Sequence, residues 1–181
     1  LTALTLQGKL KWEVVYGKAW VANHTGSRCT PTYYNGKIFL ISGNGDLVCA
    51  GTDGKIKWSV NHYEMFDGKP IQFGISESPV VTGNKVIASP GGNLASLAAF
   101  NIENGKLIWS SEPLGDGPQY VNPLLIDYAG KQIIVTVSGT MIFAVNAADG
   151  KILWKVNYAE QNGAAGNVRK NHAITPIFRD G

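Results

Sequence analysis

Polar and aromatic residues that could bind a ligand gather in four segments of this 181-residue chain. All three histidines, His24, His62 and His172, lie in these segments. The same segments supply the other candidate ligand-binding residues, which are Trp20, Arg28, Glu77, Tyr120 and Asn122. Aromatic faces beside a few polar groups suit a planar cofactor, a sugar or a protein surface, because the faces supply burial and the polar groups fix orientation.

The sequence lacks the residue patterns of the common catalytic centres. It contains no Ser-His-Asp arrangement, no HExxH motif and no phosphate-binding glycine loop, since Gly91-Gly92 follows a proline in a turn between strands. Asp46, Glu77 and Asn122 offer too few oxygens for calcium, which takes about six or more. The sequence therefore assigns no catalytic residue, and we predict no metal site in this chain.

Two sequence markers recur along the chain with the same period. The motif Gly-Lys-x-x-Trp places tryptophans 46, 51 and 45 residues apart, at Trp12, Trp58, Trp109 and Trp154. A small polar residue before proline recurs at separations of 48, 44 and 53 residues, at Thr30, Ser78, Asn122 and Thr175. A fixed period of this length is the signature of a repeat architecture.

Between each proline marker and the next tryptophan, the chain reads as four short strands. In the clearest unit, Asn35-Gly36 precedes the apolar run 38–41, and Asp53-Gly54 precedes the last strand. Asn-Gly and Asp-Gly between such runs predict hairpins, because glycine accepts the positive φ of the turn. Each unit is therefore predicted to be a four-stranded antiparallel meander.

Four strands in a period near 45 residues are typical of a β-propeller blade, and they favour that fold over helical repeats or a β-sandwich. We predict an all-β propeller segment with full blades at about 30–60, 78–111 and 122–156. Partial blades are predicted at both ends, 1–12 and a first strand at 174–181. Each repeated tryptophan is expected on an outermost strand, with its indole N–H reaching a main-chain carbonyl of the adjoining blade.

The candidate ligand-binding residues then lie in the connections between blades or, for Asn122, directly after one. These connections are long, at Glu13–Cys29, Ser59–Glu77, Ser110–Val121 and Lys155–Ile174. In an up-and-down meander they share one end of the blades, and loops of this length in a compact repeat are usually functional. That end is predicted to be the ligand-binding face.

The charge distribution argues against a nucleic-acid partner. The formal net charge is +3, but seven of the sixteen basic residues are lysines that recur in turns, at Lys9, Lys37, Lys55, Lys85, Lys106, Lys131 and Lys151. We expect them at the end opposite the connections, where they serve solubility. No apolar run approaches the roughly 18 residues of a membrane span, and a signal peptide is expected only outside this segment.

The blade sequences resemble a known repeat family. Residues 99–109 and 144–154 are similar to the tryptophan-docking motif Ala-x-Asp-x-x-Thr-Gly-Lys-x-x-Trp of quinoprotein dehydrogenases and their non-enzymatic relatives, with Asn101 and Asn146 in place of the aspartate. The resemblance covers essentially the whole chain and points to the PQQ-like (quinoprotein-type) repeats. It implies a ring of about six to eight blades, in which the remaining blades of the propeller are partners of this segment.

The resemblance implies two functions. The first is a non-catalytic scaffold, periplasmic or extracellular, that needs no cofactor and binds a protein or carbohydrate ligand on the inter-blade-loop face. The alternative is a fragment of a PQQ-dependent alcohol or sugar dehydrogenase, which would use PQQ with calcium. The adjacent-cysteine disulfide that covers the cofactor in many such enzymes has no counterpart, because Cys29 and Cys49 are twenty positions apart.

The predicted strand order also keeps the two cysteines apart. Cys29 precedes the first strand of its blade and Cys49 lies in the third, so about 10 Å and one strand separate them. A disulfide needs Cα atoms within about 6.8 Å. Cys49 is expected to be an inert core thiol, and Cys29 the cysteine more open to modification.

Overall fold

The computed structural model describes residues 1–161 and 171–179 of the chain. Within these residues the strands form one two-stranded and three four-stranded antiparallel sheets. Helix in the same part of the chain is limited to two four-residue turns, α1 (His62–Met65) and α2 (Tyr158–Gln161). The all-β, propeller-type fold predicted from the repeat is confirmed.

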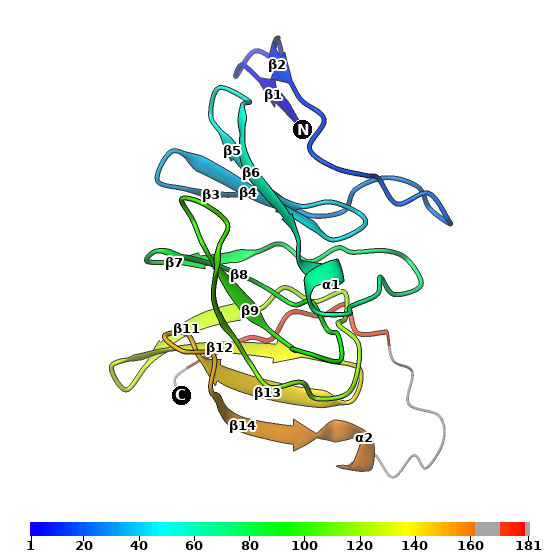
Figure 1. Ribbon diagram of the computed structural model, residues 1–181, viewed down its shortest axis with the longest axis vertical. Helices are drawn as coiled ribbons and strands as arrows, with labels where there is room; N and C mark the ends of the chain where they lie inside the picture. Colours follow the sequence, from blue (N-terminus) through cyan, green and yellow to red (C-terminus); the bar gives the residue numbers. More distant parts are fainter. Residues whose placement is uncertain (162–170, 180–181) are drawn as a thin grey trace.

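The sheets follow one another along the chain and are stacked in sequence order (Figure 1). A half blade is formed by β1 (Thr2–Leu4) and β2 (Leu10–Glu13). The first blade is formed by β3 (Thr32–Tyr34), β4 (Lys37–Ile41), β5 (Asp46–Gly51) and β6 (Ile56–Asn61). The second blade is formed by β7 (Val80–Thr82), β8 (Lys85–Ala88), β9 (Ala98–Asn101) and β10 (Leu107–Ser110). The third blade is formed by β11 (Leu124–Tyr128), β12 (Lys131–Val137), β13 (Met141–Asn146) and β14 (Ile152–Asn157).

Apolar side chains fill the spaces between neighbouring blades. One cluster between the first and second blades includes Phe39, Val86 and Phe100, which are fully buried. A second cluster, which joins the second blade to the third, includes Ile134 and Phe143. Both faces of the second blade are therefore covered, as expected for sheets that cannot bury their faces alone.

Every sheet carries an irregularity where its last two strands meet. The register shifts close to the small residue that pairs with the repeated tryptophan. These pairs are Ala3 with Trp12, Cys49 with Trp58, Ala99 with Trp109 and Ala144 with Trp154. A bulge increases local twist and re-aims the neighbouring side chain. The bulge thus belongs to the repeat and helps to present the indole to the next sheet.

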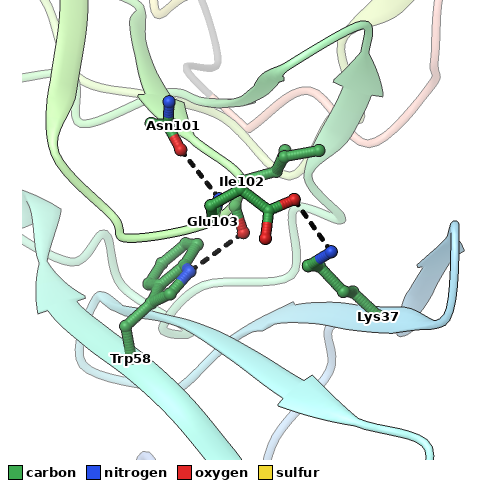
Figure 2. Close-up of polar contacts among 5 residues, drawn as sticks. All are labelled: Lys37, Trp58, Asn101, Ile102 and Glu103. Carbon is green, nitrogen blue, oxygen red and sulfur yellow. Dashed lines mark hydrogen bonds and ion pairs between the residues drawn. The ribbon is translucent and has the colours of Figure 1, made fainter.

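The repeated tryptophan links each sheet to the next one along the chain. The indole N–H groups of Trp12, Trp58 and Trp109 donate to the carbonyl oxygens of Thr52, Ile102 and Ala147 over 2.9, 3.0 and 3.2 Å. Figure 2 shows this bond for Trp58. Each ring also covers a glycine of the next Gly-Lys turn, and a Cβ on Gly54, Gly105 or Gly150 would lie only 2.8, 2.8 or 2.3 Å from it. Glycine is required there because φ is positive and the indole leaves no room for a side chain.

The first strand of a further blade, expected at 174–181, stays a prediction. No strand is assigned in its described part, 174–179, while 180–181 lie outside the described residues. A strand needs a hydrogen-bonded neighbour, and this segment has no neighbouring strand in the structure as described. It lies instead against the third blade, where Phe178 meets Tyr128 edge-on at a centroid distance of 6.1 Å.

Cys29 and Cys49 are both free thiols. Cys49 lies in β5 between its ladder partners Phe39 and Trp58, inside the core. The Cys29 sulfur accepts the Ile41 N–H at 3.2 Å, and burial raises the pKa of Cys29 to about 11. Cys29 is only partly buried whereas Cys49 is fully buried, so Cys29 stays the better candidate for modification of the two, although burial disfavours its reactive thiolate.

Candidate functional site

The strand order separates the two kinds of turn to opposite ends of the blades. The inter-blade connections 14–31, 62–79 and 111–123 and the turns between second and third strands share one end, here called the loop end. The other turns lie at the lysine end, where Lys37 of the first blade contacts Glu103 of the second at 2.9 Å (Figure 2). The candidate ligand-binding residues come from the connections at the loop end.

Aromatic side chains of the first three connections contact one another along the loop end, and a main-chain hydrogen bond joins the third connection to the fourth. The ring of His24 lies 5.8 Å from that of Phe73, which in turn lies 5.9 Å from Tyr120. The Phe73 N–H donates to the Tyr120 hydroxyl at 2.9 Å. The Tyr120 N–H donates to the His172 carbonyl at 2.9 Å, and the His172 ring meets Tyr158 edge-on at 4.8 Å. We call these five residues the aromatic row.

The row brings together three of the sequence-derived candidates, His24, Tyr120 and His172. It also contains Phe73 and Tyr158, which the sequence reasoning did not select. The four connections contribute row members at positions 24, 73, 120 and 172, separated by 49, 47 and 52 residues. A search for aromatic residues at the repeat period would therefore have found Phe73.

The Tyr158–His172 pair lines an open groove of about 500 Å³ with Val137, Ile142 and Ile174. The Tyr158 hydroxyl donates to the Gly139 carbonyl at 2.7 Å and also contacts His172 Nε2. Burial lowers the pKa of His172 and raises the pKa of Tyr158. The groove therefore presents a neutral, mainly apolar surface at neutral pH.

Trp20 and Arg28 anchor the first connection rather than reaching out from it. The Trp20 ring packs on Gly74, where a Cβ would lie 2.8 Å from the indole, and its N–H donates to Asn23 at 3.0 Å. Arg28 donates through Nη2 to the His24 carbonyl. Its Nη1 is buried without a hydrogen-bond partner among the described residues. These contacts hold the backbone that carries His24.

His62 lies in the protein interior. Its side chain is fully buried, and Nδ1 lies 2.7 Å from the Gly45 carbonyl. Burial lowers the pKa of His62 to about 4, so the ring is neutral at physiological pH and Nδ1 carries the proton donated to Gly45. The structure therefore places His62 beneath the loop end, out of reach of a surface ligand.

Glu77 is also buried, with only 3% of its surface exposed. Its Oε1 accepts the Ser89 N–H at 2.9 Å, and burial raises its pKa to about 8. Tyr63, which is buried beside it, has its pKa raised by burial and further by the charge of Glu77. At neutral pH the carboxyl group is mostly protonated, which suits an apolar site between two blades.

Asn122 belongs to a chain of links between blades. The Thr30 N–H donates to the Ser78 hydroxyl at 2.9 Å, and the Ser78 N–H donates to the Asn122 side-chain oxygen at 2.7 Å. Ser78 and Asn122 thus each accept, through a side-chain oxygen, the main-chain N–H of the same position in the preceding blade. This contact explains why that position needs a side-chain oxygen.

The oxygens that could serve a calcium ion beside PQQ do not fit that role. The Asp46 carboxylate accepts from Ser42 at 2.7 Å and Asn61 at 3.1 Å, while Glu77 and Asn122 are bound to other main-chain N–H groups. No group of three or more histidine, cysteine or carboxylate side chains with metal-binding geometry occurs in residues 1–161 and 171–179.

In the same ranges, no helix is long and apolar enough to cross a membrane.

Stacked four-stranded meanders joined by repeated tryptophans define the chain as a segment of a β-propeller built from PQQ-like repeats. The chain belongs to the outer membrane protein assembly factor BamB family, whose sequence model matches residues 1–178. A relative named outer membrane protein assembly factor BamB, from Bordetella pertussis, is 25% identical over 122 residues. The match covers 67% of this chain and 29% of the relative, so the chain spans less than a third of that protein.

Solved structures of enzymes share the fold. A europium-containing methanol dehydrogenase superposes on 86% of this chain and 38% of its own, with a TM-score of 0.58 and 18% identity. The quinohemoprotein alcohol dehydrogenase ADHIIG from Pseudomonas putida HK5 matches 73% of this chain and 20% of its own, with a TM-score of 0.53 and 18% identity. At these identities the likeness concerns the fold.

Proposed function

We propose that this chain is part of a non-catalytic, extracytoplasmic propeller scaffold whose loop end binds a protein. The observation that carries the proposal is the aromatic row. It runs over four successive connections, with His24 exposed and the other members half-buried. An extended surface of this kind suits a polypeptide partner, because aromatic residues are enriched where protein interfaces are buried.

The fixed geometry of the row supports a binding role. The Phe73 N–H to Tyr120 hydroxyl bond and the Tyr120 N–H to His172 carbonyl bond each join two connections. A surface held in place before binding loses less conformational entropy when a partner docks. A carbohydrate would instead need several free polar groups, and most polar groups of the candidate residues are already bonded within the chain.

The family supports the same kind of partner and a location at the cell envelope. The relative's name describes a factor in the assembly of outer membrane proteins. By analogy, the scaffold acts in the periplasm and contacts proteins on their way to that membrane. Further blades of the same propeller complete the ring, and the scaffold needs no cofactor.

Site-specific photo-crosslinking tests the proposal. A photoreactive phenylalanine analogue replaces Phe73 in the row or, as the control, Tyr33, an aromatic residue of β3 that is 67% exposed. The probe is a purified outer membrane β-barrel protein presented unfolded. We expect an adduct at position 73 and none at position 33, with the adduct reduced at least fivefold by His24→Ala combined with Tyr120→Phe.

The outcomes separate the candidate functions. Equal adducts at both positions would show adhesion without a site, and no adduct at position 73 would refute protein binding at the row. The similarity to quinoprotein dehydrogenases favours one other function, a PQQ-dependent oxidation. Incubation with PQQ and calcium, followed by dye-linked alcohol oxidation, tests that alternative, and a bound quinone absorbance with activity would replace our proposal.

A further inference from the structure

We propose that the lysine end binds the surface of a membrane that carries anionic lipid headgroups, so that the loop end faces away from that membrane. The proposal uses the location at the cell envelope proposed above, but it does not depend on protein binding at the aromatic row. It concerns turns at the ends of the strands. Further blades would pack against the faces of the end sheets, so these turns stay at the surface in a longer stack.

Positive charge is concentrated in the turns of the lysine end. These turns, each taken up to its lysine, are 5–9, 35–37, 52–55, 83–85, 102–106, 129–131 and 147–151. They contain seven lysines but only three carboxylates, which are Asp53, Glu103 and Asp149. The lysine end therefore carries an excess of positive charge that comes from all four sheets.

Most of these lysines have no ion-pair partner. Lys37 contacts Glu103 at 2.9 Å, and Lys55 lies 3.6 Å from Asp53. The other five form no ion pair within residues 1–161 and 171–179, and they are Lys9, Lys85, Lys106, Lys131 and Lys151. All of these except the half-buried Lys85 are exposed. Their ammonium groups thus do more than the solubility expected from the sequence requires, because they are free to meet an anionic surface.

The loop end has the opposite balance of charge. Its connections 14–31, 62–79 and 111–123 contain three basic residues and five carboxyl groups, of which Glu77 is mostly neutral at neutral pH. Figure 1 shows the turns after β3, β7 and β11 along the left edge of the stack and these connections along the right edge. An anionic surface therefore attracts one end of the strands more than the other, and this difference orients the molecule.

The type of basic residue favours a lipid surface over a shaped partner. Lysine is a point charge on a flexible stem, whereas arginine forms paired hydrogen bonds with single phosphate or carboxylate groups. The turns of the lysine end contain no arginine, and their lysines are spread over the ends of four sheets. Such an array suits the diffuse negative potential of anionic lipids, to which each nearby lysine adds attraction.

This orientation leaves the aromatic row accessible. The row lies at the loop end, at the opposite ends of the same strands. With the lysine end against the membrane, the row faces the aqueous phase, where an unfolded polypeptide could reach it.

Co-sedimentation with lipid vesicles tests the proposal. One set of vesicles is phosphatidylcholine alone, and the other contains about one third phosphatidylglycerol, which is anionic. Lys106→Gln combined with Lys151→Gln removes two exposed charges from the lysine end, and glutamine keeps the main-chain N–H groups that are bonded within these turns. Lys18→Gln combined with Lys69→Gln is the matched control, because it removes two exposed charges from the loop end.

We expect the unchanged chain to bind the anionic vesicles roughly tenfold more strongly than the neutral ones, and to lose this binding as salt is raised. The lysine-end variant should bind about tenfold more weakly, and the loop-end control should stay within about twofold of the unchanged chain. Circular dichroism verifies that each variant is folded.

Three results would overturn the proposal. A chain that does not bind the anionic vesicles would leave an acidic protein as the partner of the lysine end. Equal losses for the two variants would show that net charge, and not the lysine end, governs binding. Release by inorganic phosphate at constant ionic strength would indicate a site for single phosphate groups instead of a lipid surface. None of these results bears on crosslinking at position 73, so this proposal and protein binding at the row can fail separately.

Discussion

The indole of Trp109 illustrates how much of the fold rests on single residues. It fills the space between the second and third blades and donates to Ala147 at 3.2 Å. A large buried ring with a satisfied N–H contributes both apolar area and a hydrogen bond. Burial of Glu77 and His62, by contrast, destabilises the fold when these side chains are charged. The stability of the fold therefore depends on their protonation and so on pH.

Replacing Trp109 by alanine should lower the free energy of unfolding by about 3–5 kcal/mol, because it leaves a cavity and an unpaired carbonyl. Urea unfolding monitored by circular dichroism measures this loss. Ile108→Ala is the control, since its side chain is 41% exposed on the same strand. A loss below about 1 kcal/mol for Trp109→Ala would mean that the indole does not hold the blades together.

The pH dependence of stability should change when Glu77 is replaced by glutamine. With a folded pKa of about 8 against 4.5 unfolded, the folded state binds more protons between these values, so Glu77 makes stability fall as pH rises through that window. Glu77→Gln removes this slope, and we expect the variant to exceed the unchanged chain in stability above pH 8. Denaturation midpoints from pH 5 to about 9 measure the difference.

The control for this experiment is Glu64→Gln, because Glu64 is exposed in α1. This variant should keep the downward slope of the unchanged chain. If stability changed with pH in the same way for the unchanged chain and for Glu77→Gln, the Glu77 carboxyl group would not have the raised pKa described above.

At the scale of elements, the Gly-Lys turn and the proline marker have related roles. The glycine of the turn leaves room for the indole of the preceding sheet to pack on it. The side-chain oxygen of the residue before proline accepts a main-chain hydrogen bond from the preceding blade. Both contacts join neighbouring sheets at opposite ends of the strands. A blade is therefore fixed to its neighbour at two separated points, which restricts rotation between them.

Gly105→Ala should destabilise the chain more than Gly130→Ala, although both glycines have similar positive φ values of +69° and +73°. The Cβ at position 105 would lie 2.8 Å from the Trp58 ring, whereas nothing lies within 4 Å at position 130. The strain of positive φ is common to both variants. The difference between their losses in free energy of unfolding therefore measures the contact between Gly105 and the Trp58 ring. We expect a difference of about 1–3 kcal/mol in urea unfolding, and equal losses would contradict the role of the glycine.

At the scale of the whole molecule, the sheets of the described residues differ in how far their faces are covered. The second blade is covered on both faces, while the half blade has only two strands and exposed leucines. Because each sheet contacts only its neighbours, stability should vary along the stack as it does in other repeat proteins.

Native-state hydrogen exchange should follow this gradient. We expect amides of β1 and β2 to exchange first, because a two-stranded sheet is marginally stable alone. Amides of β8 and β9 should exchange last, since these strands are buried between two neighbours. Mass spectrometry of peptic fragments measures the order, and uniform exchange along the chain would show that the stack opens as one unit.

The sequence by itself determined the repeat, the strand order and the docking tryptophans, because these follow from local turn chemistry and a fixed period. Tertiary structure alone decided which candidate residues meet at the loop end. His62 and Glu77 look like surface ligands in the sequence, yet they are buried, and Phe73 joins Tyr120 across two connections. The side chains of long connections are placed by packing between blades that are distant in sequence, so their burial and their contacts follow only from the tertiary structure.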